Sequence, residues 1–160
     1  LDEGHVIGNH TYSHEYGKIY SSVEAFFEDV DKLNSLLEEF TGQTTEILRF
    51  PGGFHNTVSK AAGGSDIMQK IADEALKRGY KYFDWNVTSG DATVAGGVLP
   101  KDTIVKNVLS TTRNRKNIIV LMHDTASKNT TVQALPDIIE GLAAQGYKFG
   151  VLSKYVQAKN

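Results

Sequence analysis

The sequence contains no cysteine, so it can form neither a disulfide nor a thiolate zinc site, and nitrogen and oxygen remain as possible metal ligands. It has only 3 prolines and no apolar run of about 18 residues, the length needed to cross a bilayer. Neither sign of charge predominates, because the net charge is −2 and the lysines and arginines are scattered. These absences argue against a transmembrane segment and against a nucleic-acid-binding surface, and a neutral polymer is a better fit.

What remains is the composition of an ordinary globular protein. The chain has 160 residues, of which 40% are hydrophobic and 22% charged, enough to bury one core. We therefore expect residues 1–160 to form a single domain.

Helical and strand patterns alternate along the chain. Apolar residues at helical spacing predict four helices. The first follows a capping box at Ser21 and Glu24, and the others span 67–77, about 100 to 112, and about 131 to 145. Apolar or aromatic runs predict strands at 47–50, 80–85, 117–122 and 147–151. Strands separated by single helices are typical of β-α units with a parallel sheet, so the predicted class is α/β.

Two histidines, His10 and His14, stand four residues apart in the run Gly8-Asn9-His10-Thr11-Tyr12-Ser13-His14. In a helix or tight turn this spacing lets both imidazoles face one point, and imidazole is the commonest neutral metal ligand. On its own the pair also fits two exposed polar residues with no catalytic contact.

Three further motifs follow in a fixed order, and each is placed at or near the end of an expected strand: Arg49-Phe50-Pro51-Gly52-Gly53, Phe83-Asp84-Trp85-Asn86 and Leu121-Met122-His123-Asp124. Together with the histidine pair, this set resembles the NodB-type polysaccharide deacetylases, carbohydrate esterase family 4, from about residue 4 to about residue 151. The resemblance implies an irregular (β/α) barrel in which these motifs lie at the C-terminal ends of the strands.

One part of the family pattern is missing from the chain. The resemblance implies an initial strand with two aspartates, one a metal ligand and one the catalytic base, and no such run occurs here. We therefore expect a barrel that is incomplete at its N-terminal side, a third metal ligand upstream of residue 1, and no activity from this chain alone. An open barrel edge would also favour self-association.

The resemblance assigns a role to each motif residue. His10 and His14 would bind a divalent metal, foremost zinc. His123 would be the general acid, Asp84 would accept its other ring N–H, and Arg49 would pair with the upstream catalytic aspartate.

The groove itself is assigned to three further residues. The backbone N–H of Gly52 would stabilise the oxyanion, although many family members carry tyrosine at that position. Trp85 and Leu121 would line the pocket for the acetyl methyl group, a role compatible with plain core packing. We expect Asp91 and Asp124 to be solvated loop residues and His5 and His55 to be exposed.

The implied function is metal-dependent removal of N-acetyl groups from a cell-wall or chitin-like polysaccharide, foremost the N-acetylglucosamine of peptidoglycan, with metal-bound water as nucleophile. By resemblance the protein is bacterial and extracytoplasmic, secreted or associated with the cell wall. The alternative is a catalytically inactive carbohydrate-binding module that has kept the deacetylase groove.

Overall fold

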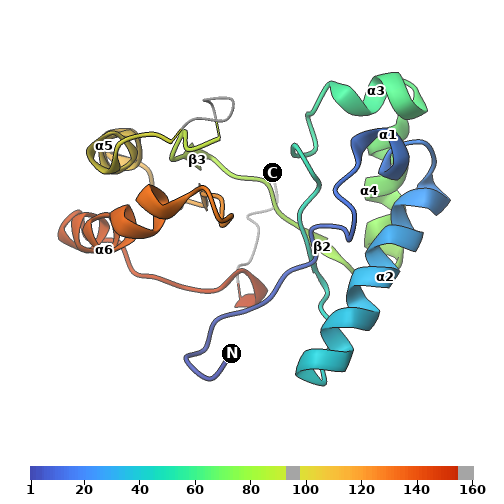
Figure 1. Ribbon diagram of the computed structural model, residues 1–160, viewed down its shortest axis with the longest axis horizontal. Coiled ribbons are helices and arrows are strands. Elements are labelled where there is room, and N and C mark those ends of the chain that lie inside the picture. The colour runs from blue at the N-terminus through green and yellow to red at the C-terminus, as the bar shows by residue number, and fades with distance from the viewer. Residues whose placement is uncertain (93–97, 155–160) are drawn as a thin grey trace. The chain divides into compact units, whose positions relative to one another are not determined.

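The structure is a computed structural model that describes residues 1–92 and 98–154 (Figure 1). The chain divides into two compact units. The first comprises residues 1–84 together with the chain from 150 onward, and the second comprises residues 85–149.

The first unit contains most of the helices. Its elements in chain order are α1 (Tyr16–Ile19), α2 (Val23–Thr41), β1 (Ile47–Leu48), α3 (Val58–Gly63), α4 (Ile67–Lys77), β2 (Lys81–Tyr82) and the 3-10 turn η1 (Leu152–Lys154). Strands β1 and β2 pair in parallel, with Leu48 opposite Tyr82, and Asn9 forms a parallel bridge to Leu48. The chain therefore passes from this small sheet directly into the loop that carries His10 and His14.

Helix α2 illustrates how local sequence fixes an element. Ser22 is its N-cap and accepts a hydrogen bond from the N–H of Ala25, while Gly42 ends the helix with a left-handed φ of 69°. The expected capping box between Ser21 and Glu24 does not form, because the Ser21 hydroxyl donates to the carbonyl of Lys18 instead. Phe40 is 77% exposed in the last turn.

The core of the first unit is largely aromatic. Phe26 of α2 stacks on Tyr20 at 5.8 Å between ring centroids and lies 5.6 Å from Phe50. The buried members of this core are Ile19, Tyr20, Phe26, Phe27, Val30, Leu48, Phe50, Ile67, Met68, Ile71, Ala72 and Ala75.

The second unit repeats the β-α pattern. It contains β3 (Val87–Thr88), α5 (Lys101–Thr112), β4 (Val120–Leu121) and α6 (Asn129–Ala144), and α5 packs against both α6 and β3. Strands β3 and β4 pair in parallel, with Val87 opposite Val120. The buried residues of this second core are Val87, Ile104, Val108, Ala134, Ile138 and Leu142.

The helices follow the sequence pattern more closely than the strands do. The prediction of 67–77 is confirmed by α4, and α5 and α6 begin and end within two residues of their expected bounds. The predicted strand 80–85 is only partly confirmed, since β2 covers Lys81–Tyr82 alone and a separate strand, β3, begins at Val87. The predicted strand at 147–151 is wrong, because those residues have no strand pairing.

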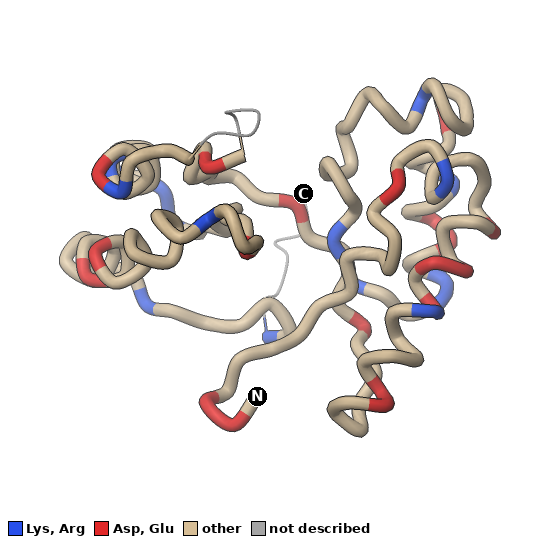
Figure 2. The backbone as a smooth tube through the Cα atoms, viewed as in Figure 1, with Lys and Arg blue, Asp and Glu red and all other residues tan. Residues whose placement is uncertain are grey.

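The α/β class is confirmed, but the described strands do not form a closed barrel. They make two parallel sheets of two strands each, β1–β2 and β3–β4. None of the described helices has the length and apolar character required to cross a membrane. Lysines and arginines alternate with acidic residues along both units, in keeping with the balanced charge (Figure 2).

Candidate active site

His10 and His14 lie close together on the loop that precedes α1. Their ring centroids are 5.1 Å apart and the rings meet edge to face at 62°. The Nδ1 of His10 lies 2.7 Å from the carbonyl oxygen of Arg49. A carbonyl can only accept, so Nδ1 carries the proton and the lone pair of this ring is on Nε2.

The loop between the two histidines is folded by a buried asparagine. Asn9 is fully buried, and its side-chain oxygen accepts the N–H of Thr11 at 2.9 Å. Its amide group donates to the carbonyl of Val30 and to the side chain of Asn34, both on α2 and both at 2.9 Å. The start of the loop is thus tied to the middle of α2.

A buried aspartate of α2 holds the next part of the loop. One carboxylate oxygen of Asp29 accepts the backbone N–H groups of Tyr12 and Ser13 at 2.7 and 2.8 Å. These bonds support an unusual backbone, since Thr11 and His14 both have left-handed φ values, 67° and 56°. Backbone of this kind persists where the surroundings enforce it, and it is common in binding loops.

The geometry of the pair fits a shared metal ion. Two imidazoles whose nitrogens lie 2.0–2.1 Å from one tetrahedral ion have ring centroids roughly 5 Å apart. The hydrogen bond from His10 to the Arg49 carbonyl is the kind that orients a metal-ligating histidine. In the described part of the chain no group of three metal-binding side chains occurs, so the pair supplies two donors.

Arg49, Gly52 and Asp84 also belong to the first unit, at and beyond the ends of β1 and β2. The Nε of Arg49 donates to the carbonyl of Phe83 at 3.1 Å, and burial lowers the pKa of this guanidinium while the charge of Asp84 opposes that shift. Both carboxylate oxygens of Asp84 lie 3.1 Å from the N–H of Phe54. Gly52 is exposed and has a φ of 76°.

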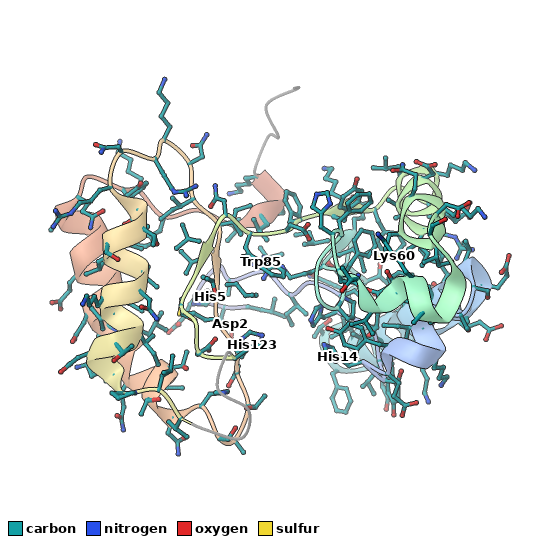
Figure 3. All side chains as sticks on the ribbon, turned by 90° about the horizontal axis from the view of Figure 1, so that it is seen from above. Asp2, His5, His14, Lys60, Trp85 and His123 are labelled. Carbon is teal, nitrogen blue, oxygen red and sulfur yellow. The ribbon has the colours of Figure 1, made fainter. Side chains whose placement is uncertain are left out.

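His123 belongs to the second unit, two residues beyond the end of β4 (Figure 3). Its Nδ1 lies 2.8 Å from one carboxylate oxygen of Asp91, and its backbone N–H donates to the other oxygen at 2.8 Å. The carboxylate can only accept, so Nδ1 carries the proton, as in a histidine oriented for acid–base catalysis.

The sequence-based assignment of this carboxylate is therefore wrong. We expected Asp84 to accept the ring N–H of His123 and Asp91 to be a solvated loop residue. Asp91 is instead 1% exposed and occupies that position, while Asp84 is bonded to Phe54. The other expectations of exposure are confirmed, since His5, His55 and Asp124 are exposed.

The parallel register of β3 and β4 explains why Asp91 meets His123. Thr88 lies opposite Leu121, so the residues just after these two strands emerge at the same edge of the sheet. Asp91 comes three residues after Thr88, and His123 two residues after Leu121. A predicted strand at 87–88 would have indicated that Asp91 and His123 meet. The prediction of a single strand over 80–85 gave no such indication.

The carboxylate of Asp91 is held ionised by its neighbours. Burial acts to raise its pKa, but hydrogen bonds from His123 and Ser89 outweigh burial and leave the pKa below the ordinary value. The hydroxyl of the buried Thr131 also donates to this carboxylate at 3.1 Å. His123 keeps 38% of its side chain exposed, so the imidazole is anchored on one side and accessible on another.

The two residues predicted to line the acetyl pocket both belong to the second unit and are half-buried. Trp85 begins that unit, and Leu121 is the last residue of β4. The predicted site residues are thus divided between the units: His10, His14, Arg49, Gly52 and Asp84 in the first, and Trp85, Leu121 and His123 in the second.

Comparison with known proteins identifies the family. The family model of polysaccharide deacetylases matches residues 1–69, the segment with the histidine pair and the Arg49 motif. A peptidoglycan-N-acetylglucosamine deacetylase of Bacillus cereus is 32% identical over 163 residues, covering 100% of this chain and 67% of that protein. The chain belongs to the polysaccharide deacetylase family.

A solved structure also supports membership of the polysaccharide deacetylase family. The catalytic domain of the peptidoglycan N-acetylglucosamine deacetylase from Eubacterium rectale is 38% identical, with a TM-score of 0.88 over 96% of this chain and 67% of that chain. A second Bacillus cereus peptidoglycan-N-acetylglucosamine deacetylase is 26% identical over 92% of this chain. The present chain spans only 50% of the length of that relative.

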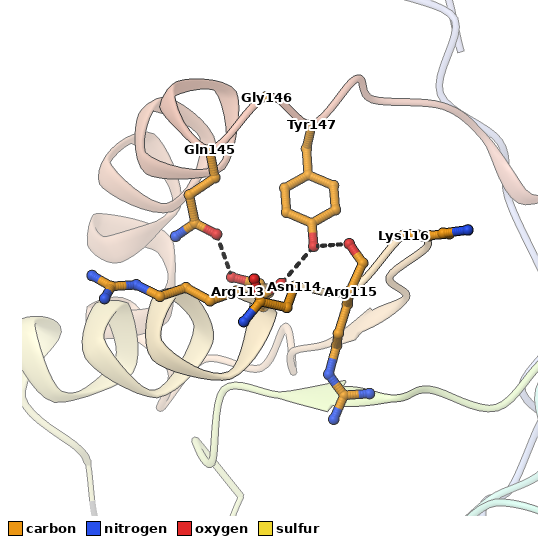
Figure 4. A pocket seen from close by; sticks show the side chains of 8 residues that line it. Arg113, Asn114, Arg115, Lys116, Gln145, Gly146 and Tyr147 are labelled. Carbon is orange, nitrogen blue, oxygen red and sulfur yellow. Dashed lines mark hydrogen bonds between the residues drawn. The ribbon is translucent and has the colours of Figure 1, made fainter.

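This polysaccharide deacetylase chain also has a pocket of about 470 Å³ in the second unit, lined by residues 112–116 and 145–147 (Figure 4). The Tyr147 hydroxyl lies 2.6 Å from the carbonyl oxygens of both Thr112 and Arg115. The cationic side chains of Arg113, Arg115 and Lys116 point in different directions in Figure 4. They do not converge on one point as an anion-binding site requires.

Proposed function

We propose that the protein is a metal-dependent N-deacetylase that hydrolyses acetamido groups of peptidoglycan N-acetylglucosamine. The observation that carries the proposal is the 2.8 Å contact between His123 Nδ1 and the buried carboxylate of Asp91, in a chain whose relatives are peptidoglycan deacetylases. An oriented, partly exposed imidazole of this kind is suited to proton transfer.

His10 and His14 would hold the metal ion, with zinc as the first candidate. When bound, the metal would supply a nucleophilic water at neutral pH and polarise the carbonyl of the acetamide. A third ligand, by resemblance an aspartate, would complete the site. Asn9 and Asp29 would keep the two imidazoles in position through the loop contacts described above.

His123 would deliver the proton that the leaving amine needs. Its Nδ1–H is bonded to Asp91, so the proton that reaches the leaving group is the one on Nε2. Transfer of the Nε2 proton to the amine nitrogen, as the C–N bond of the tetrahedral intermediate breaks, releases the amino sugar and acetate. A positioned acid of this kind contributes roughly 10²–10⁴ in rate.

The remaining motif residues have supporting roles in this proposal. The backbone N–H of Gly52 would donate to the developing oxyanion, and Arg49 would pair with the upstream catalytic carboxylate. Trp85 and Leu121 would contact the acetyl methyl group. We further propose that residues 1–160 form part of one NodB-type barrel domain and that it acts outside the cytoplasm at the cell wall.

The decisive measurement is acetate release from peptidoglycan and from N-acetylglucosamine oligomers by the protein that carries this chain. We expect chelation of the metal to abolish release and His123→Ala to lower turnover by roughly 10²–10⁴. His55→Ala, which removes an exposed histidine, is the matched control and should leave turnover unchanged.

The alternative function predicts a different result in the same assay. An inactive carbohydrate-binding module would retain the oligomers without releasing acetate. Full activity of the His123→Ala protein would refute the proton-transfer role.

A further inference from the structure

Tyr16, the first residue of α1, brings a phenol hydroxyl close to the histidine pair. Its ring meets the His14 ring edge to face, with 5.4 Å between centroids and 81° between planes. A Cβ placed on Gly52 would lie 2.9 Å from the Tyr16 hydroxyl oxygen. The hydroxyl therefore stands between a predicted metal ligand and the predicted oxyanion donor.

Tyr16 fills the space that a side chain at position 52 would occupy. The same imagined Cβ would lie 3.0 Å from the Cβ of Asn56 and 3.1 Å from the Tyr16 ring. The left-handed φ of Gly52, 76°, also disfavours any residue with a side chain. Glycine at 52 and tyrosine at 16 are thus a matched pair, in which the Tyr16 ring and the Asn56 side chain leave no room for a side chain at 52.

The Tyr16 ring is fixed on its other side. It contacts the ring of Tyr20, with centroids 5.8 Å apart, and Tyr20 is fully buried with its hydroxyl donating to the Pro51 carbonyl at 2.7 Å. A hydroxyl held in this way needs little further ordering when a ligand binds.

Three other tyrosine hydroxyls are engaged within the protein. Tyr20 donates to Pro51, Tyr80 accepts from Asn34, and Tyr147 lies between two carbonyl oxygens. Within the part of the chain that the structure describes, the hydroxyl of Tyr16 makes no hydrogen bond to another protein group. Such a half-buried hydroxyl lacks an internal partner and is able both to donate and to accept.

We propose that Tyr16 is a substrate-binding residue whose phenol hydroxyl hydrogen-bonds a ring hydroxyl of the N-acetyl sugar beside His14. This inference rests on the proposed deacetylase function, which assigns the acetamide oxygen to the metal and to the Gly52 N–H. The sugar hydroxyls are the remaining polar groups of a neutral N-acetylated saccharide. Loss of the Tyr16 hydroxyl should then weaken binding and leave the chemical step intact.

Kinetics of Tyr16→Phe test the proposal, because phenylalanine keeps the ring and removes only the hydroxyl. We expect KM for N-acetylglucosamine oligomers to rise roughly three- to tenfold with kcat unchanged. Tyr12→Phe is the matched control, since Tyr12 lies on the same loop, is 47% exposed, and stacks under Lys32. Unchanged KM in Tyr16→Phe, or a fall in kcat alone, would overturn the binding role.

A binding measurement separates failure of this inference from failure of the proposed function. Nuclear magnetic resonance titration with the same oligomers needs no turnover, and Tyr16→Phe should raise the dissociation constant by the same factor. If the wild type is inactive and Tyr16→Phe still weakens oligomer binding, the proposed deacetylase function is refuted and the contact between Tyr16 and the sugar is supported. Equal affinities of the wild type and Tyr16→Phe for the oligomers would refute the contact between Tyr16 and the sugar, but not the deacetylase function.

A double-mutant cycle tests the matched pair without any ligand. Gly52→Ala should lower the melting temperature strongly in the wild type and less in a Tyr16→Ala background, where the contact with Tyr16 is gone and only the contact with Asn56 remains. The strain from the positive φ is common to both backgrounds and cancels in the comparison. Additive effects would show that Tyr16 does not occupy the space at Gly52.

Discussion

At the scale of single residues, Asp91 is the group on which the proposed role of His123 depends. Its carboxylate accepts the ring and backbone N–H groups of His123 and the hydroxyl of Thr131. Asp91→Asn keeps the shape but turns one acceptor into a donor, which leaves buried groups unpaired. We expect a loss of about 1–3 kcal/mol in the free energy of unfolding, measured with urea at pH 7.

The matched control is Asp84→Asn. Both oxygens of Asp84 face the N–H of Phe54, so the amide retains one acceptor for that bond and should cost less stability. In the acetate assay Asp91→Asn should lower kcat more than Asp84→Asn, because only Asp91 contacts the imidazole. Equal losses would contradict the assignment of Asp91 as the partner of His123.

The pH dependence of unfolding follows from the lowered pKa of Asp91. A carboxyl whose pKa is lower in the folded than in the unfolded state contributes stability that is complete above the unfolded value, about 3.9. That contribution is lost as the pH falls through the folded value. The stability difference between wild type and Asp91→Asn should therefore shrink as the pH falls below about 4. A difference independent of pH would refute the ionised state.

The comparison of these aspartates shows where sequence reasoning about the site succeeded and failed. The pairing of His10 with His14 followed from residue spacing alone, and the structure places their rings in contact. The choice between Asp84 and Asp91 depended on which residue follows a strand. Two-residue strands leave almost no periodic signal, so the register that brings Asp91 to His123 could not be inferred.

At the scale of elements, α2 is both a core helix and the support of the histidine loop. Phe26, Phe27 and Val30 pack into the core, and Asp29 on the same helix reaches the loop backbone. The amphipathic pattern predicts the helix but not its buried carboxylate. A charged residue between apolar neighbours is usually interpreted as solvated, and only the three-dimensional contact with Tyr12 and Ser13 explains its burial.

Removal of that carboxylate should disturb the proposed metal site at a distance. Asp29→Ala leaves two loop N–H groups unpaired and releases the constraint on the left-handed residues Thr11 and His14. We expect a loss of about 1–3 kcal/mol in unfolding free energy, and zinc affinity about 10- to 100-fold weaker by calorimetry. Asp31→Ala is the control, because Asp31 is exposed on α2 and pairs only with Arg78 at 3.5 Å. Equal zinc affinity in both variants would refute the support role.

At the scale of the whole molecule, the chain has two separate cores of unequal size. The first contains twelve buried residues, four of them aromatic, whereas the second contains six, all aliphatic. Stability rises with the apolar surface removed from water, so the larger core should resist denaturant longer. The second unit, residues 85–149, is therefore expected to open first.

Hydrogen exchange followed by mass spectrometry at increasing urea measures each unit separately. Amides of α5 and α6 should exchange at lower urea than those of α2 and α4. Ile104→Ala, which deletes a fully buried side chain of the second core, should lower that first transition by about 2–5 kcal/mol and leave the α2 amides unaffected. Ile71→Ala in α4 is the reciprocal variant, since Ile71 is equally buried in the first core. Simultaneous exchange of both units in all three proteins would mean that they unfold as one cooperative body.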